Sequence, residues 1–583
     1  MRQYRLLTRQ EILQLQTDGS RATDWSLVEV SEDFAPSQIA QSRIEGRLKL
    51  DSKAQLRYST ISNYYIGENA IVDSVTRLEC RHASTFGNGV SVATINECGG
   101  RSVKIYTSLT AQCAYIMAIY RHRPELILAM ENMVDRYSTT LESTMGYVGA
   151  NSQIINSRTI REVNIGANVI IDGVSKLENA TISSNAKVGT DVKGCDFIAA
   201  EGAKIDNGAI IERCFVGERA IVSNGFTAAD SLIFANSHLE NGEAASIFAG
   251  PYTVSHHKSS LLIAGIFSFF NAGSGSNQSN HLFKCGAVHQ SAHLRGTKFS
   301  SGAYIMSPAV EAPFTVVIGH HSAHHDTTQF PYSYLVERDH KSLLIPAANI
   351  ASYGLVRDIK KWQERDKRTL KRDIINFDEH NPYICGFIIS AIEKLKSLCD
   401  QNRQAEMLHC NGFTITRARA ERAIGLYSKA LDVSLACMLQ GDNCKCSRGE
   451  GVWLDLAGQY ISKQSVEILL NKIESGEVES LESIDCYLKE FDAAYNSHAY
   501  SWAHQTFANA LGHIPTKGDI ADLIARAKEA KSHLQNLSDI DKDKDCSLAM
   551  SVSYGLDSRN EGSDIIDDYN NVRGLSHSST PRK

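Results

Sequence analysis

The sequence lacks several features that would place the protein in a common class. Its most apolar stretch, residues 259–270, is shorter than the roughly 20 residues of a membrane-spanning helix, so we expect a buried strand there. The first residues contain no apolar segment typical of a secretory signal, and we expect none. The chain also has neither a CxxC pair typical of structural zinc nor a glycine-rich nucleotide-binding fingerprint.

Charge and cysteine usage narrow the class further. A formal net charge of -6 gives no overall attraction to nucleic acid or to an anionic membrane, so we expect neither as a partner. The 14 cysteines are scattered without a regular framework, and only Cys444 and Cys446 form a CxC pair. Free thiols in a reducing compartment are the simplest interpretation, and we expect a cytoplasmic protein.

A six-residue unit recurs in the first half of the chain. It consists of an aliphatic residue, Gly, two mostly polar residues, a small residue and another aliphatic one, and it occurs at 66–71, 165–170 and 216–221. This period fits neither a helix nor an alternating strand. It is typical of a coil with flat faces, in which short parallel strands point aliphatic residues inward. Ordinary sandwich strands are the alternative.

Helical spacing replaces the repeat in two places. We expect a helical insertion at 108–140, where Pro124 suits the start of a second helix. We divide the chain into a lead-in (1–54), a left-handed parallel β-helix that contains the insertion (55–335), an α-helical domain (336–536) and a disordered tail (537–583). The fold class is therefore mainly β, with a C-terminal α-helical domain.

Nine of the 20 histidines fall between residues 249 and 335. No other part of the chain gathers so many groups that can move protons, bind metal or hold anions. Consecutive histidines on a strand point to opposite sides, so at most one of each pair in 320–325 could serve a site. That run precedes Thr327, Thr328 and Pro331, and we expect it to form an exposed loop.

Two long motifs carry a resemblance to a known family: GPYTVSHHKSSLLIAGIFSFFNAGSGSNQSNH at 250–281 and PFTVVIGHHSAHHDTTQFPYSYL at 313–335. Together with YRLLTRQEILQLQ, YRHRPELI and WLDLAG, they resemble a bacterial family of long hexapeptide-repeat proteins that carry a domain-of-unknown-function label. The resemblance covers residues 4 to 505. It implies a left-handed β-helix followed by a helical domain, and it implies no reaction. Hexapeptide-repeat proteins more widely include acyltransferases, often trimeric, sugar-nucleotide enzymes and a zinc-dependent carbonic anhydrase.

Polar residues at both ends of the apolar stretch form the candidate site. If 259–270 is one buried strand, the next coil could bring its two ends together, and buried polar groups need partners or a ligand. As catalytic residues we expect His256, His257, His281 and Asn277. As substrate-binding residues we expect Asn271, Asn280, Lys284, Arg295 and Lys298.

The sequence favours a transferase that acts on a small polar or phosphorylated substrate. The group that it transfers could come from acyl-CoA or from a nucleotide sugar. The alternative is a ligand-binding or scaffold solenoid without chemistry, and the third is a metal-dependent lyase or hydrolase. We assign no metal ligand, and we expect a homo-oligomer.

Overall fold

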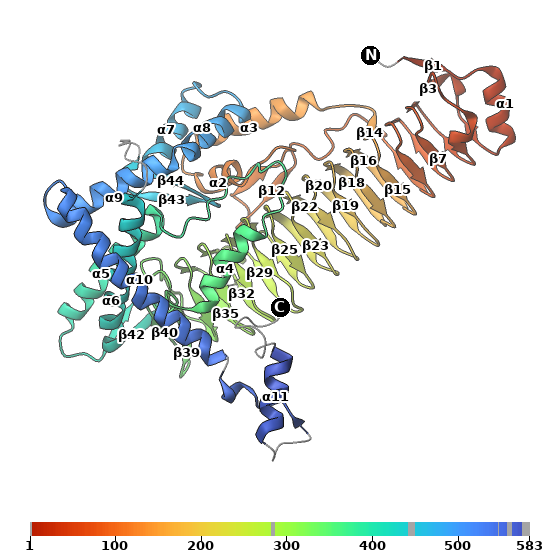
Figure 1. The fold of residues 1–583 in the computed structure, drawn as a ribbon. Helices are drawn as coiled ribbons and strands as arrows, with labels where there is room; N and C mark the ends of the chain where they lie inside the picture. The colour runs from red at the N-terminus through yellow and green to blue at the C-terminus, as the bar shows by residue number, and fades with distance from the viewer. Residues whose placement is uncertain (1–2, 282–285, 441–448, 546, 557–561, 574–583) are drawn as a thin grey trace.

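A computed structural model of the chain describes residues 3–281, 286–440, 449–545, 547–556 and 562–573. It shows a parallel β-solenoid of about 18 turns, followed by a helical region that lies along the C-terminal half of the solenoid (Figure 1). The predicted fold class is confirmed. Within the described residues, no helix is long and apolar enough to cross a membrane.

Each coil has three faces, and each face is named here after one of its strands. The β25 face contains β4 (Ile39–Ala40), β7 (Gln55–Arg57), β10 (Ile71–Asp73), β15 (Gln153–Ile155), β17 (Ile170–Asp172), β19 (Lys187–Val188), β21 (Lys204–Ile205), β23 (Ile221–Ser223), β25 (His238–Glu240), β28 (Val254–Ser255), β31 (Asn271–Ala272), β34 (Lys298–Phe299), β37 (Val316–Ile318) and β39 (Tyr334–Arg338).

The other two faces meet at a shared edge. The β29 face contains β2 (Arg21–Ala22), β5 (Arg43–Ile44), β8 (Thr60–Ser62), β11 (Arg77–Glu79), β26 (Glu243–Ala245), β29 (Leu261–Ile263), β32 (Asn277–Ser279), β35 (Tyr304–Met306) and β38 (His320–His321). The β30 face contains β3 (Val28–Ser31), β6 (Leu48–Leu50), β9 (Tyr64–Ile66), β14 (Gly146–Val148), β27 (Phe248–Ala249), β30 (Gly265–Phe267), β33 (Ser291–His293) and β36 (Ala309–Glu311). Longer strands bend across both faces: β16 (Thr159–Ile165), β18 (Lys176–Ile182), β20 (Lys193–Ala199), β22 (Ile210–Val216) and β24 (Thr227–Ile233).

The central coils repeat every 17 residues, as the register Ile170↔Lys187↔Lys204 shows. That is one residue fewer than three six-residue units. The difference arises at the corner inside each long strand, which is turned by a single residue with positive φ, for example Asn179 (φ 48°) or Asp196 (φ 54°). Asn and Asp tolerate this left-handed conformation better than other residues with side chains.

The insertion is longer than the helical pattern indicated. It lies between β11 and β14 and contains the hairpin of β12 (Ser91–Ala93) and β13 (Ser102–Lys104), then α2 (Ala111–Ile119) and α3 (Pro124–Thr140). The parallel ladder continues across it, because β10 pairs directly with β15. Parallel pairing also begins at β2 and β3, inside the segment that the sequence analysis assigned to a lead-in.

The last coil passes into the helical region through β40 (Lys341–Ile345), which pairs with both β39 and β42. The remaining elements are α4 (Tyr353–Glu364), α5 (Pro382–Gln401), β41 (Met407–Cys410), β42 (Phe413–Thr416), α6 (Arg417–Leu439), β43 (Trp453–Leu456), β44 (Gln459–Ser462), α7 (Lys463–Glu474), α8 (Leu481–Ala493), α9 (Tyr495–Leu511), α10 (Lys517–Asp545) and α11 (Gly562–Arg573). β1 (Tyr4–Leu6) and α1 (Arg9–Thr17) cover the first coil, where β1 pairs antiparallel with β3.

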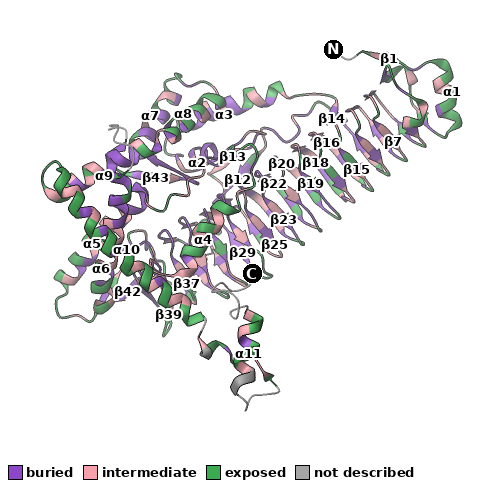
Figure 2. Ribbon diagram, viewed as in Figure 1, coloured by how far each residue is buried: buried purple, intermediate pink, exposed green. Residues whose placement is uncertain are grey.

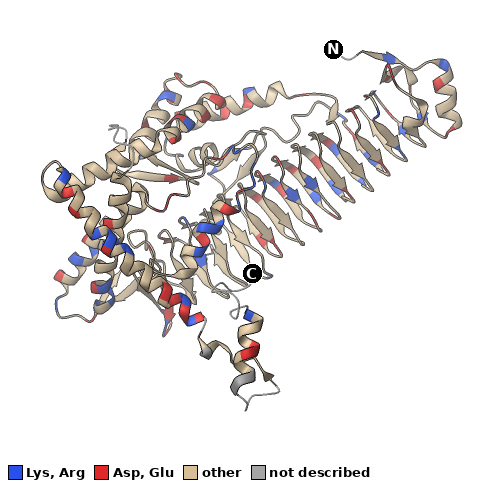
Figure 3. Cartoon of the chain, viewed as in Figure 1, with Lys and Arg blue, Asp and Glu red and all other residues tan. Residues whose placement is uncertain are grey.

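Two apolar cores hold these parts together. One fills the interior of the solenoid, and the other joins the insertion and the helical region to the outside of the coils through Phe215, Phe234 and Phe248. Figure 2 shows buried residues inside the coils and on the helices that face them. Basic and acidic residues alternate along the coils (Figure 3), and pairs such as Arg213–Asp230 (2.7 Å) link neighbouring coils.

Candidate functional site

A cleft of about 650 Å³ lies where the β30 face, the insertion and the helical region meet. Its floor consists of the outward-facing residues of three successive strands, Ile266, Ala292 and Val310, which stand in register and are half-buried. The floor is therefore an apolar stripe that runs across the coils. Side chains from the other two parts form the walls: Tyr115 and Ile119 from the insertion, and Tyr383, Phe387 and Trp453 from the helical region.

The insertion contributes one arginine, Arg101, to the lining of this cleft. The guanidinium of Arg101 donates to Gln290 Oε1 (2.9 Å) and to the carbonyl of Ala118 (3.0 Å). Burial lowers the pKa of Arg101, and the nearby charge of Arg121 lowers it further. Arg121 donates to Glu131 (3.4 Å), but its Nε and Nη2 are buried without a hydrogen-bond partner among the described residues. Arg101 is therefore the group of the insertion wall that could hold an anion, since a guanidinium binds carboxylates and phosphates.

Arg295 also borders the cleft, but its guanidinium is held within the protein. It donates to Asp455 (3.2 Å) and to the carbonyl of Asn376, and it lies over the rings of Phe269 (3.8 Å) and Tyr460 (4.4 Å). Only 3% of the residue is exposed. Arg295 is one of the substrate-binding residues predicted from the sequence, and the contacts of its guanidinium lie between the solenoid and the helical region.

A chain of polar side chains lies behind the floor, inside the last coils. Gln278 contacts His293 Nε2 (3.0 Å), His293 Nδ1 contacts Glu311, and His325 Nε2 contacts Glu311 Oε1 (2.6 Å). Burial alone would raise the pKa of Glu311, but His293 and His325 outweigh it and hold the pKa well below its usual range. Burial alone would lower the pKa of His325, but the hydrogen bond to Glu311 raises it.

The run at 320–325 differs from its prediction. His320 and His324 are exposed, whereas His321 and His325 are buried, so the prediction of an exposed loop is wrong for these two. The reason is that His320–His321 forms β38, whose pairing with β35 turns His321 inward. Its opposite orientation to His320 follows the strand alternation expected from the sequence. Burial lowers the pKa of His321 to about 4.

The apolar stretch 259–270 is two strands rather than one. β29 and β30 are separated by a corner at Ala264 (φ 50°), because the coil requires a turn after three residues on each face. The polar groups at the two ends of the stretch therefore belong to different parts of the coil. This removes the geometric reason for expecting them to meet.

The nine predicted site residues lie on several surfaces. His256, Asn271 and Lys298 follow one another on or beside the β25 face, where Lys298 forms an ion pair with Asp358 of α4. Asn277 lies on the β29 face opposite Tyr304.

The others are separated from that group. Asn280 is buried and donates to Glu97 of the insertion, and His257 and His281 are exposed. Lys284 lies outside the described residues. None of the described ones except Arg295 lines the cleft.

Sequence reasoning missed Arg101 in the insertion, Glu311 in the polar chain, and two partners of His256. Those partners are His238 and Glu240, which stand beside His256 because His238 pairs with Val254 in the next coil. The register of the coils is the signal that could have found them. The six-residue units alone do not supply it, because the spacing between coils varies.

Two family models match the sequence. One, described as Domain of unknown function (DUF4954), matches residues 55–399, and the other, Domain of unknown function (DUF6819), matches residues 436–580. An uncharacterized protein of Treponema pallidum (strain Nichols) is 24% identical over 460 residues, which are 69% of this chain and 62% of that protein. The chain thus spans less than two thirds of the length of that relative.

A solved structure gives a weaker likeness. It is the crystal structure of a proposed acetyltransferase from Desulfovibrio desulfuricans G20, with 12% identity and a TM-score of 0.11, over 57% of this chain and 68% of that one. A likeness at that level carries no conclusion about activity. The first family model, in contrast, matches more than half of the chain, so the protein belongs to the family described as Domain of unknown function (DUF4954).

Proposed function

We propose that the protein binds a small molecule with an apolar body and an anionic end in the cleft between the β30 face and the helical region. The observation that supports this most directly is the apolar floor of Ile266, Ala292 and Val310, with Arg101 of the insertion in the same lining. Ligand sites of this size are mostly apolar, with a few polar groups that fix orientation. Acyl-CoA thioesters and nucleotide sugars, the donors considered from sequence, both carry phosphates on a larger body.

Transfer chemistry is the finer part of the proposal. A transferase needs a base within hydrogen-bond reach of the acceptor. The histidine in the lining of the cleft is His293, which is fully buried against Phe267 and Phe270 and contacts Glu311. Binding without chemistry therefore has the more direct support, and product formation from a bound donor would identify the transferase.

A homo-oligomer stays a prediction, to be checked by light scattering.

The first experiment tests the anionic end. We expect a thermal-shift screen of acyl-CoA thioesters and nucleotide sugars to find a ligand that raises the melting temperature, because a ligand of the folded state stabilises it. Replacing Arg101 with Gln should then weaken binding by about 10-fold or more, as expected for a charged hydrogen bond. Arg43→Gln is the matched control, because Arg43 is an exposed residue of β5 near the N-terminal end of the solenoid.

A second variant tests the floor. Ala292→Trp would fill the cleft from below, because Ala292 faces outward between Ile266 and Val310. It should abolish binding while leaving the melting temperature of the free protein nearly unchanged. Thr159→Trp, at an outward-facing position of β16, is the control. Undiminished binding in both Arg101→Gln and Ala292→Trp would reject the cleft as the site.

A further inference from the structure

Three side chains that can bind metal project from the β25 face, away from the cleft. His238 and Glu240 are the first and last residues of β25, and His256 follows β28 in the next coil. Residues two apart on a strand share a face, so His238 and Glu240 point outward together. The register His238↔Val254 and Leu239↔Ser255 places His256 next to Glu240. The ladder thus assembles the group from two coils.

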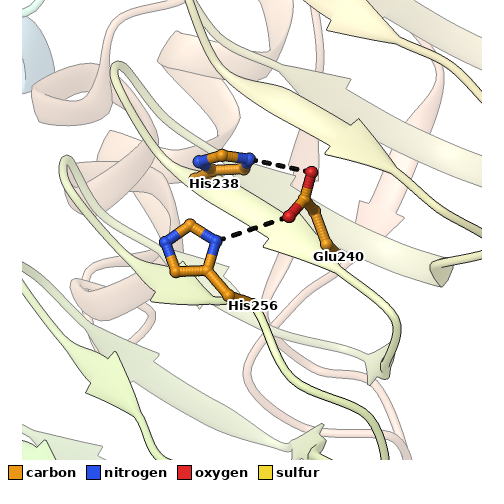
Figure 4. Close-up of side chains that lie close together, drawn as sticks. All are labelled: His238, Glu240 and His256. Carbon is orange, nitrogen blue, oxygen red and sulfur yellow. Dashed lines mark ion pairs between the residues drawn. The ribbon is translucent and has the colours of Figure 1, made fainter.

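The distances between the donor atoms suit a metal ion bound by all three residues. His238 Nε2 lies 3.1 Å from Glu240 Oε1, and His256 Nδ1 lies 3.5 Å from Glu240 Oε2 (Figure 4). One donor atom from each residue can be chosen so that all three lie within 4.8 Å of one another. All three side chains remain partly exposed, so an ion could reach them from solvent.

Neighbouring groups hold the donors in place. Ser223, in the preceding coil, donates a hydrogen bond to Glu240 Oε1 (2.9 Å), and Asn241 donates to the carbonyl of His256 (2.9 Å). Both hydrogen bonds come from groups outside the three proposed ligands, so they would remain when an ion is bound.

We propose that His238, Glu240 and His256 form a binding site for a divalent transition-metal ion of the zinc type. Two imidazoles and one carboxylate are donors that zinc accepts, whereas calcium and magnesium prefer oxygen ligands alone. The fourth outward position of the two coils belongs to Val254, which offers no ligand. Among the described residues no further His, Cys, Asp or Glu joins the group, so the remaining coordination position is open to water or to an external ligand, as in sites that act on a bound molecule.

The competing explanation is an ion-pair network without metal, in which a protonated histidine balances Glu240. The two explanations differ in what removal of one imidazole does to metal affinity. The test uses the full chain without an affinity tag, titrated with zinc in competition with a chelator of known affinity. We expect one zinc ion per chain at high affinity. His238→Ala and His256→Ala should each weaken it at least about 10-fold.

His257→Ala is the matched control, since His257 is adjacent in sequence, exposed and outside the cluster. It should leave the affinity unchanged. Val254→His adds a ligand at the fourth position and should tighten binding, a gain that loss of folding cannot mimic. The proposal is overturned if the parent chain binds no stoichiometric zinc, or if His257→Ala weakens binding as much as His238→Ala does.

Discussion

At the residue scale, the interior of the solenoid changes character in its last coils. Along the β30 face, the inward column runs from Val216 and Ile233 through Ala249 and Phe267 to His293 and Glu311. A buried carboxylate is tolerated only when it is paired and hydrogen-bonded. Glu311 meets this condition because His293 and His325 contact its two oxygens. The interior of the last coils can thus hold the ionised Glu311 only because His293 and His325 are beside it.

The variant Glu311→Gln tests this arrangement through pH. The raised pKa of His325 means that its contribution to stability is complete below about 6.5 and is lost as pH rises through the folded-state pKa. The lowered pKa of Glu311 means that its contribution is present above about 4.3 and is lost only at lower pH. The variant should therefore destabilise the last coils by about 3 kcal/mol near pH 6, and by less at pH 9.

Hydrogen exchange of β33 and β36, compared with the parent chain at each pH, measures this loss. His321, whose pKa lies at about 4, stays neutral in the folded chain at both pH values. Glu212→Gln is the control, because Glu212 is exposed and forms an ion pair with the neighbouring Arg213. An equal loss at pH 6 and pH 9 would contradict the assigned direction of the His325 shift.

At the scale of the element, the corner is the part of each coil that depends most on residue type. Asn168 has φ 56°, and its side chain lies between those of Asn151 (3.4 Å) and Asn185 (3.3 Å) in a ladder along the solenoid. Each asparagine thus turns the chain and bonds to the corner of the neighbouring coil. The ladder reaches back to Asn69 across the insertion, since Asn69 donates to Asn151 (3.2 Å).

Asn168→Ala should destabilise the surrounding coils by about 1–2 kcal/mol, because alanine is strained in the left-handed region. Asn168→Gly loses the same side-chain bonds without that strain, so it should be about 1 kcal/mol more stable than the alanine variant. Hydrogen exchange of β15, β17 and β19 measures both. If alanine and glycine have equal effects, the hydrogen-bond ladder rather than the backbone conformation determines the corner.

The solenoid could be predicted from the repeat, because the three copies of the six-residue unit occupy the same position within their coils. Ile66 and Ile165 both pair with Val148, so the first two units occupy the same position in the coil. Helical spacing likewise predicted α2 and α3. The cleft was not predictable, because its parts come from distant segments: Arg101 in the insertion, Ala292 in a coil and Trp453 in the helical region. The cluster around Glu240 could be found only from the register between coils. The number of residues per coil varies, so the sequence alone did not give that register.

At the scale of the whole molecule, charged groups fasten the three parts to one another. The carboxylate of Asp373 accepts hydrogen bonds from Ala111 N of the insertion (2.8 Å) and from Ala235 N of a coil (3.2 Å). Glu218 of a coil accepts hydrogen bonds from the backbone of residues 370–372. Arg295 adds the third connection, next to the cleft. The shape of the cleft therefore depends on these contacts as well as on its lining.

Arg295→Ala tests whether the helical region can be released from the coils. Removal of the guanidinium leaves Asp455 buried without its cation, and loss of one partner of a buried pair costs about 3–5 kcal/mol. We expect the helical circular-dichroism signal to melt at a lower temperature than in the parent chain, while the coils keep their own transition. Arg158→Ala, at an exposed corner of a coil, should leave both unchanged. A single transition at the parent temperature would show that the apolar core around Phe215, Phe234 and Phe248 holds the two parts together without Arg295.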